Sequence, residues 1–89
     1  MKKATVTIYS RPGCHLCEDA KAAVMASGCA DEVILQEINI DDDAQLRERY
    51  QYDIPVVFIN GVKLFKHRVD PRDFKRKLRR LADASDAHL

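Results

Sequence analysis

Apolar and polar residues alternate over residues 4–9, and the β-branched residues in this segment favour a β-strand. Arg11-Pro12-Gly13 ends the alternation. From Cys14 the apolar positions recur with helical spacing, and Ser27-Gly28 provides a stop for that helix. Its apolar positions fall on two neighbouring stripes, one of Leu16, Ala20 and Ala23 and one of Cys17, Ala20 and Val24.

Residues 33–40 read as a second strand, so the first 40 residues predict a βαβ unit with two parallel strands and a right-handed crossover. The acidic run 41–43 is suited to capping a short helix. The inner face of that helix is predicted to hold Leu46 and Tyr50.

Residues 54–59 are continuously apolar, as expected of a central strand that is covered on both faces. Asn60-Gly61 then predicts a two-residue hairpin turn of type I′. Residues 62 to about 67 would return as an antiparallel edge strand, where Lys63 and Lys66 guard the open edge.

Asp70-Pro71 is typical of a helix start, since Asp caps and Pro occupies the first helical position. Phe74, Leu78 and Leu81 then follow at helical spacing and should face the sheet. The predicted class is α/β in the order β-α-β-α-β-β-α, with a four-stranded mixed sheet flanked by helices. We expect one domain over residues 1–82 and a C-terminal tail over 83–89.

Composition narrows the function classes only slightly. The chain has 89 residues and a formal charge of +1, so its net charge indicates no particular partner. Residues 63–80 carry nine Lys or Arg against two Asp, but no interleaved aromatic accompanies them. We therefore interpret that segment as a solvated helix face and expect no nucleic-acid partner. The sequence contains neither a membrane-length apolar run nor a signal-peptide pattern, and we expect a cytoplasmic monomer that does not bind membranes.

The two cysteines of Cys14-His15-Leu16-Cys17 stand where the first strand meets the first helix. A cysteine at a helix N-terminus is favoured as the thiolate, because unpaired N–H groups and the helix dipole stabilise the anion. Cys17 lies on the same face one turn later, where it can displace a mixed disulfide formed at Cys14. We therefore predict a redox dithiol in which Cys14 attacks and Cys17, the more buried sulfur, resolves.

The charges near this pair do not all act in one direction. Arg11 is close enough in sequence to support the thiolate, and His15 would do so when protonated. Glu18 and Asp19 stabilise the helix start but oppose a neighbouring thiolate. We still expect the Cys14 thiolate to be more populated than that of a free cysteine.

The cysteines also allow other interpretations. A zinc site needs a second ligand pair, and His15, Cys29, His67 and His88 do not form one, so no metal ligands are predicted. Three alternatives stay open: inert sulfurs, a binding module with little turnover, and an iron–sulfur or zinc carrier acting through Cys14. Cys29 is interpreted as a small, half-buried hydrophobic residue, and a regulatory thiol is the minority alternative.

Pro55 lies inside an apparent central strand, where proline is unusual. Either the strand begins at Pro55 or the Ile54–Pro55 peptide bond is cis.

Together, Tyr9–Lys21 (YSRPGCHLCEDAK) and Asp53–Val62 (DIPVVFINGV) resemble the active-site segment and the cis-proline strand of glutaredoxins, and the resemblance extends from Thr5 to Leu81. It implies a thioredoxin-like fold, a cis Pro55 beside the cysteines and a backbone at Ile54 that binds a thiol peptide. Arg11, His15, Ile54 and Pro55 would then bind substrate, while Cys14 and Cys17 carry the reaction.

The resemblance further implies reduction of protein or glutathione mixed disulfides, with electrons from glutathione or a thioredoxin-type reductase. The chain departs from the usual family pattern by carrying His15-Leu16 between the cysteines and Lys66–Asp73 (KHRVDPRD) where a Gly-Gly pair would help hold glutathione. We expect no bound cofactor, and glutathione is a candidate co-substrate only. The features are typical of a divergent small glutaredoxin-like protein.

Overall fold

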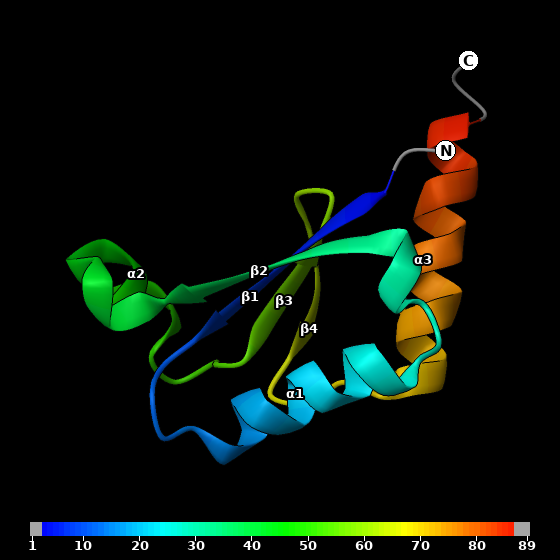
Figure 1. Ribbon diagram of the computed structural model, residues 1–89. Helices are drawn as coiled ribbons and strands as arrows, with labels where there is room; N and C mark the ends of the chain where they lie inside the picture. The colour runs from blue at the N-terminus through cyan, green and yellow to red at the C-terminus, as the bar shows by residue number, and fades with distance from the viewer. Residues whose placement is uncertain (1–2, 87–89) are drawn as a thin grey trace.

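A computed structural model describes the backbone of residues 3–86 and the side chains of residues 3–81 (Figure 1). Four strands and three α-helices alternate in the predicted order β-α-β-α-β-β-α, which confirms the α/β class. Their bounds are β1 Ala4–Ser10, α1 His15–Ala26, β2 Val33–Asn39, α2 Ala44–Tyr50, β3 Val56–Ile59, β4 Val62–Lys66 and α3 Pro71–Asp86. Two short 3-10 helices, η1 (Ala30–Glu32) and η2 (Ile40–Asp42), flank β2.

The strands form one mixed sheet in the order β2-β1-β3-β4. β1 and β2 are parallel, with Ala4 opposite Val33 and Ser10 opposite Asn39, as the βαβ prediction requires. β3 runs antiparallel to both β1 and β4, so the sheet is mixed as expected. Since β1 and β2 are parallel, the carboxyl end of β1, which leads toward the two cysteines, lies at the same edge as the carboxyl end of β2.

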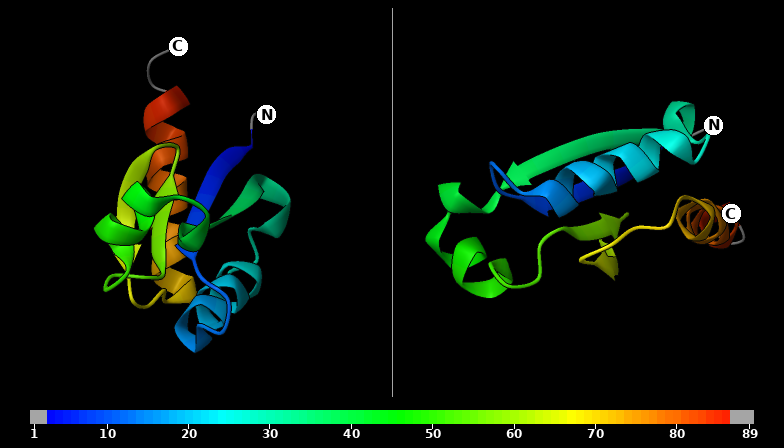
Figure 2. Two further views of the ribbon diagram at one scale, coloured as in Figure 1. Left: turned by 90° about the vertical axis from the view of Figure 1, so that its left-hand side faces the viewer. Right: turned by 90° about the horizontal axis from the view of Figure 1, so that it is seen from below.

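Two apolar clusters cover the sheet. The larger joins one face of the strands to α1 and α3, through Val24 of α1 and through Phe74 and Leu78 of α3. The smaller packs Ile40 and Tyr50 against Val56 on the other face, near α2. Figure 1 and the view from below in Figure 2 show α2 and α3 at opposite ends of the sheet. This arrangement confirms the predicted inner faces of α2 and α3.

The β3–β4 hairpin turns as predicted at Asn60-Gly61. Both residues have positive φ, 50° and 82°, which is the signature of a type I′ turn. The Asn60 side chain accepts a hydrogen bond from the Thr5 amide at 2.9 Å, and the Asn60 amide donates to the Thr5 carbonyl at 2.8 Å. The turn is therefore anchored to the start of β1.

Several predicted boundaries shift by one or two residues. β3 begins at Val56, so Pro55 precedes the strand and removes no ladder hydrogen bond from its interior. β2 ends at Asn39 because Ile40 enters η2, and β4 ends at Lys66 because His67 adopts a φ of 70°.

The structure selects between the two predicted stripes of α1 and corrects the prediction for Cys29. The helix turns Cys17, Ala20 and Val24 toward the sheet, and Leu16 is 37% exposed. Cys29 is fully buried in the larger cluster rather than half-buried, since the chain turns inward after Gly28.

α3 begins as predicted. The Asp70 carboxylate accepts hydrogen bonds from the amides of Arg72 and Asp73, and Pro71 takes the first position. The helix continues to Asp86, so the predicted tail is helical over residues 83–86, and residues 87–89 lie outside the described residues. Over the part of the chain that the structure describes, no helix is long and apolar enough to cross a membrane.

Candidate redox site

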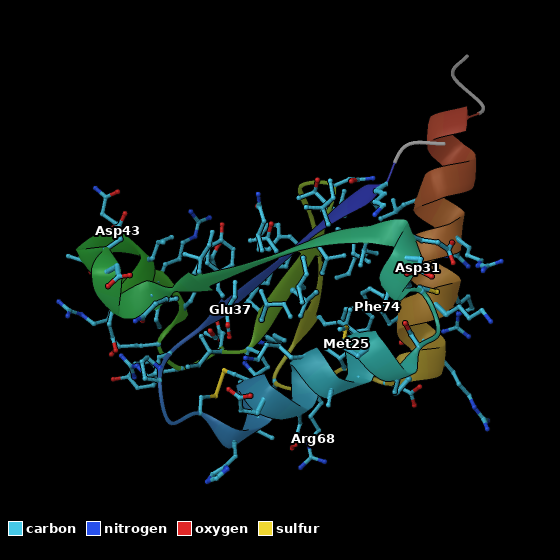
Figure 3. All side chains as sticks on the ribbon, viewed as in Figure 1. Met25, Asp31, Glu37, Asp43, Arg68 and Phe74 are labelled. Atoms are coloured by element: carbon cyan, nitrogen blue, oxygen red, sulfur yellow. A yellow bond between two sulfur atoms is a disulfide. The ribbon has the colours of Figure 1, made fainter. Side chains whose placement is uncertain are left out.

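Cys14 and Cys17 are joined by a disulfide at the N-terminal end of α1, visible as the yellow bond in Figure 3. Their Cα atoms are 5.2 Å apart. Cys17 is 2% exposed and lies on the buried face of the helix, whereas Cys14 is partly exposed at the start of the helix. The two sulfurs therefore differ in access, as the sequence predicted.

Cys14 is itself the N-cap of α1. Its backbone is extended, and its Sγ accepts a hydrogen bond from the Cys17 amide at 3.1 Å. An N-cap side chain normally supplies an oxygen to these unpaired amides, and here a sulfur takes that place. The same amide and the positive end of a twelve-residue helix would stabilise a negative charge on Cys14 when the disulfide is open.

The loop before α1 holds the cap in place. The Cys14 amide donates to the Arg11 carbonyl at 3.3 Å, which closes a tight turn over Pro12 and Gly13. Gly13 has a φ of 79°, a conformation that residues with a Cβ adopt only with strain. The Pro-Gly pair thus sets the angle at which the chain enters the helix.

Arg11, which was predicted to support the Cys14 thiolate, has a carboxylate partner in the structure. The Arg11 guanidinium forms a two-point pair with Asp41 in η2, with nitrogen–oxygen distances of 2.8 and 3.3 Å. The hydrogen bond to Arg11 lowers the pKa of Asp41, and that to Asp41 raises the pKa of Arg11. Arg11 therefore joins the loop that precedes Cys14 to η2 at the end of β2, and Asp41 offsets its positive charge.

Sequence reasoning missed the partner Asp41, because the acidic run 41–43 was interpreted only as a helix cap. Asp43 does cap α2, accepting hydrogen bonds from the amides of Gln45 and Leu46. Asp41 instead points to a residue 30 positions away. Spacing within the run gives no signal of such a long-range pair.

A second cluster of polar side chains, which was also not predicted, links α1 to the sheet. Glu37 accepts hydrogen bonds from Ser10 Oγ at 3.0 Å and from Lys21 Nζ at 3.3 Å. Lys21 also pairs with Glu18, and these two carboxylates raise the pKa of Lys21. Figure 3 shows Glu37 reaching from β2 toward α1, on the side of the sheet where the disulfide lies. Lys21 lies four residues after Cys17, on the same helix face.

The Ile54–Pro55 peptide bond is cis, as the family resemblance implied. Pro55 is fully buried, and its carbonyl accepts a hydrogen bond from the His67 amide at 2.9 Å. His67 is one of the two non-glycine residues with positive φ among the described residues, at a place where the resemblance expected glycine. The loop before β3 lies beside the start of α1 in Figures 1 and 2.

The backbone of Ile54 is only half available for strand-like pairing. Its N–H already donates to the Tyr50 carbonyl at 3.1 Å, within the turn that follows α2. Within residues 3–86, no donor reaches the Ile54 carbonyl. A bound peptide would therefore find an open acceptor here, and it would have to displace Tyr50 to reach the donor.

Of the remaining predicted site residues, His15 is exposed at the first position of α1, next to the exposed Leu16. Both residues lie between the two cysteines in the sequence. In the described part of the chain, His, Cys, Asp and Glu side chains form no group of three that could hold a metal ion. Cys29 is remote in the fold and lies in the larger core cluster.

Comparison with known proteins decides the family. Residues 5–79 match the model of the glutaredoxin-like domain (DUF836). The chain belongs to this family. A Dictyostelium discoideum protein described as a glutaredoxin-like protein homolog is 33% identical over 75 residues, which cover 78% of this chain and 69% of that protein.

Solved structures agree with this assignment. A structural-genomics target from X. campestris is 27% identical with a TM-score of 0.71, covering 82% of this chain and 93% of that one. A Nitrosomonas europaea protein is 29% identical with a TM-score of 0.68, covering 79% and 85%. A malaria-parasite thioredoxin-2 has a TM-score of 0.66 at 14% identity, covering 88% and 82%, and supports the thioredoxin fold alone. This glutaredoxin-like chain therefore has the predicted fold, and its cysteine pair stands at the end of the sheet where that prediction put it.

Proposed function

We propose that this glutaredoxin-like protein is a dithiol–disulfide oxidoreductase in which Cys14 attacks the substrate and Cys17 resolves the intermediate. One observation carries the proposal. A partly exposed sulfur caps the helix and accepts an amide hydrogen bond, while the second sulfur is buried one turn behind it and bonded to the first. Exposure suits attack on an incoming disulfide, and burial suits a resolving role within the protein.

The reaction begins with both cysteines reduced. The Cys14 thiolate attacks one sulfur of a substrate disulfide R–S–S–R′, forms a Cys14–S–S–R bond, and releases R′–S⁻, which takes up a proton. Cys17 then loses its proton and attacks Cys14 Sγ. The Cys14–S–S–R bond breaks, R–S⁻ leaves and is protonated, and the Cys14–Cys17 disulfide remains. Two electrons pass from the protein to the substrate, and an external dithiol or two thiols must restore the reduced pair.

The substrate class we propose is a protein disulfide or a glutathione mixed disulfide on a protein. The open carbonyl of Ile54 and the exposed Leu16 offer contacts to a polypeptide near Cys14. His67 supports a protein disulfide over glutathione, because a side chain stands where a glycine would let the backbone approach a small ligand closely. The electron donor is proposed to be glutathione or a thioredoxin-type reductase.

The test compares the intact protein with Cys14→Ser, Cys17→Ser and Cys29→Ser in two assays. One assay measures reduction of a protein disulfide with a thioredoxin reductase as donor, and the other measures reduction of a glutathionylated protein with glutathione as donor. We expect turnover in at least one assay, its complete loss in Cys14→Ser and no loss in Cys29→Ser. If the intact protein turns over in neither assay, the proposal is wrong and the pair serves binding or structure instead.

A further inference from the structure

Over residues 71–81, most of the exposed side chains of α3 are basic. Five basic residues line an open hollow of about 580 Å³ on this helix: Arg72, Lys75, Arg76, Arg79 and Arg80. The opposite face of the helix is fully occupied, because Phe74 and Leu78 are buried in the core. Over residues 71–81 the helix therefore turns its charged side chains to solvent, at the end of the sheet away from α2 (Figure 1).

This arrangement opposes the stability of the free helix. Arg72 and Arg76, Lys75 and Arg79, and Arg76 and Arg80 are each four residues apart, a spacing at which like charges repel. Arg72 also stands in the first turn, where the positive end of the helix dipole disfavours a cation. The stability of the helix itself therefore does not explain why cations occupy this face.

Nearby carboxylates relieve only part of the repulsion. Asp73 pairs with Arg76 and Lys77, and Glu32 of η1 pairs with Arg79 at 3.2 Å. Among the side chains of residues 3–81, none forms an ion pair with Arg72 or Lys75. A negatively charged partner would supply the missing counter-charge for these two residues.

We propose that this basic face of α3 is a docking surface for a short acidic segment of a partner protein. Four of its five cations are arginines, whose planar guanidinium groups match carboxylates with two parallel hydrogen bonds. Insertion into a lipid surface does not fit, because the apolar side of the helix is already buried and cannot enter a membrane.

The size and borders of the face favour a polypeptide over nucleic acid. Residues 72–80 span about 12 Å of helix at 1.5 Å per residue. Glu32 stands beside this stretch and would repel a phosphate backbone that continued past Arg79. The one aromatic residue of α3 among residues 71–81, Phe74, is buried and offers no stacking surface for bases. A run of a few Asp or Glu residues with neutral flanks meets these limits.

The experiment measures binding of a fluorescein-labelled octaglutamate peptide to the full chain at low salt, with octaglutamine and a 16-base-pair DNA duplex as comparison probes. Arg72→Gln, Lys75→Gln and Arg76→Gln are combined in one variant. The matched control combines Arg47→Gln, Arg49→Gln and Lys63→Gln, which removes the same net charge from other exposed positions. We expect octaglutamate affinity to fall about tenfold or more in the first variant and less than about twofold in the control.

Equal losses in the two variants would show that net charge alone attracts the peptide and would overturn the proposal. Absence of octaglutamate binding, or tighter binding to the duplex than to the peptide, would also overturn it. A second measurement tests the premise of unrelieved repulsion. Because Gln keeps a similar helix propensity, Arg72→Gln/Lys75→Gln should raise the melting temperature at low salt, and a lower melting temperature would contradict the premise.

Discussion

The three cysteines of the chain lie in different environments. Cys14 and Cys17 are the same residue type three positions apart, yet one caps a helix and the other is buried. Cys29 has the same thiol without either position, since it is enclosed by the larger core cluster. Chemical reactivity should therefore follow location rather than residue type.

We expect a thiol reagent added to the fully reduced protein to modify Cys14 at least about a hundredfold faster than Cys29. Cys29 is 0% exposed, so its modification requires the fold to open. Mass spectrometry of peptides from a timed alkylation measures both rates in one sample. Similar rates for Cys14 and Cys29 would contradict the difference in burial.

The ion pair between Arg11 and Asp41 should make the stability of the folded protein depend on pH in the acidic range. Because the hydrogen bond from Arg11 lowers the pKa of Asp41 in the folded state, this contribution to stability is present above the ordinary value of 3.8. It is lost as the pH falls through the lower, folded-state pKa. Asp41→Asn should therefore be less stable than the intact protein at neutral pH, and the difference should shrink in acid.

Denaturant melts of both proteins at several pH values below 7 measure this difference. Asp42→Asn is the matched control, since Asp42 is exposed beside Asp41 and forms no ion pair within residues 3–81. A constant difference between Asp41→Asn and the intact protein at all pH values would contradict the assignment.

The boundaries of helices and strands can be predicted from the sequence where a capping or turn residue restricts its own backbone. Asn60-Gly61 turned the hairpin and Asp70-Pro71 started α3 as expected, because each pair restricts its own backbone. The exposure of Leu16 could not be predicted, because two adjacent stripes fit the helical period equally well and only packing against the sheet selects between them. The Arg11–Asp41 pair was missed because it joins segments 30 residues apart.

Removal of the α3 cap should cost about 1 kcal/mol of the free energy of unfolding, because Asp70→Ala leaves two amides without their acceptor. Asp42→Ala is the control, because the carboxylate of Asp42 caps no helix among the described elements. Urea denaturation of both variants measures the difference. A loss as small as that of the control would mean that the cap is dispensable.

The anchor of α3 on the sheet is Phe74, which is 0% exposed and lies 6.3 Å from Phe65 of β4 between ring centres. Phe74→Ala should lower the free energy of unfolding by about 3–5 kcal/mol, since it opens a cavity in the larger cluster. Tyr52→Ala, at a residue that is 83% exposed, should change it by less than about 0.5 kcal/mol. Equal effects in urea denaturation would contradict the core assignment.

The cysteine pair and the basic face of α3 lie in different parts of the molecule. The disulfide lies at one end of α1, while the basic face of α3 lies at the end of the sheet away from α2. The sequence alone predicted the order of elements and the position of Cys14 and Cys17 at the start of α1, since these depend on strand–helix spacing. The roles of the two cysteines stay a prediction. It could not predict that the Ile54 N–H is already bonded to Tyr50, because that bond arises from the folded turn after α2.

The central claim is that Cys14 forms the covalent intermediate and Cys17 removes it. Its most direct test incubates reduced Cys17→Ser with a disulfide-bonded protein and identifies the linked residues by mass spectrometry. The account predicts a stable mixed disulfide through Cys14, and no accumulation of it with the intact protein, because Cys17 resolves it. Failure of Cys17→Ser to form this adduct, or an adduct through Cys29, would contradict the account.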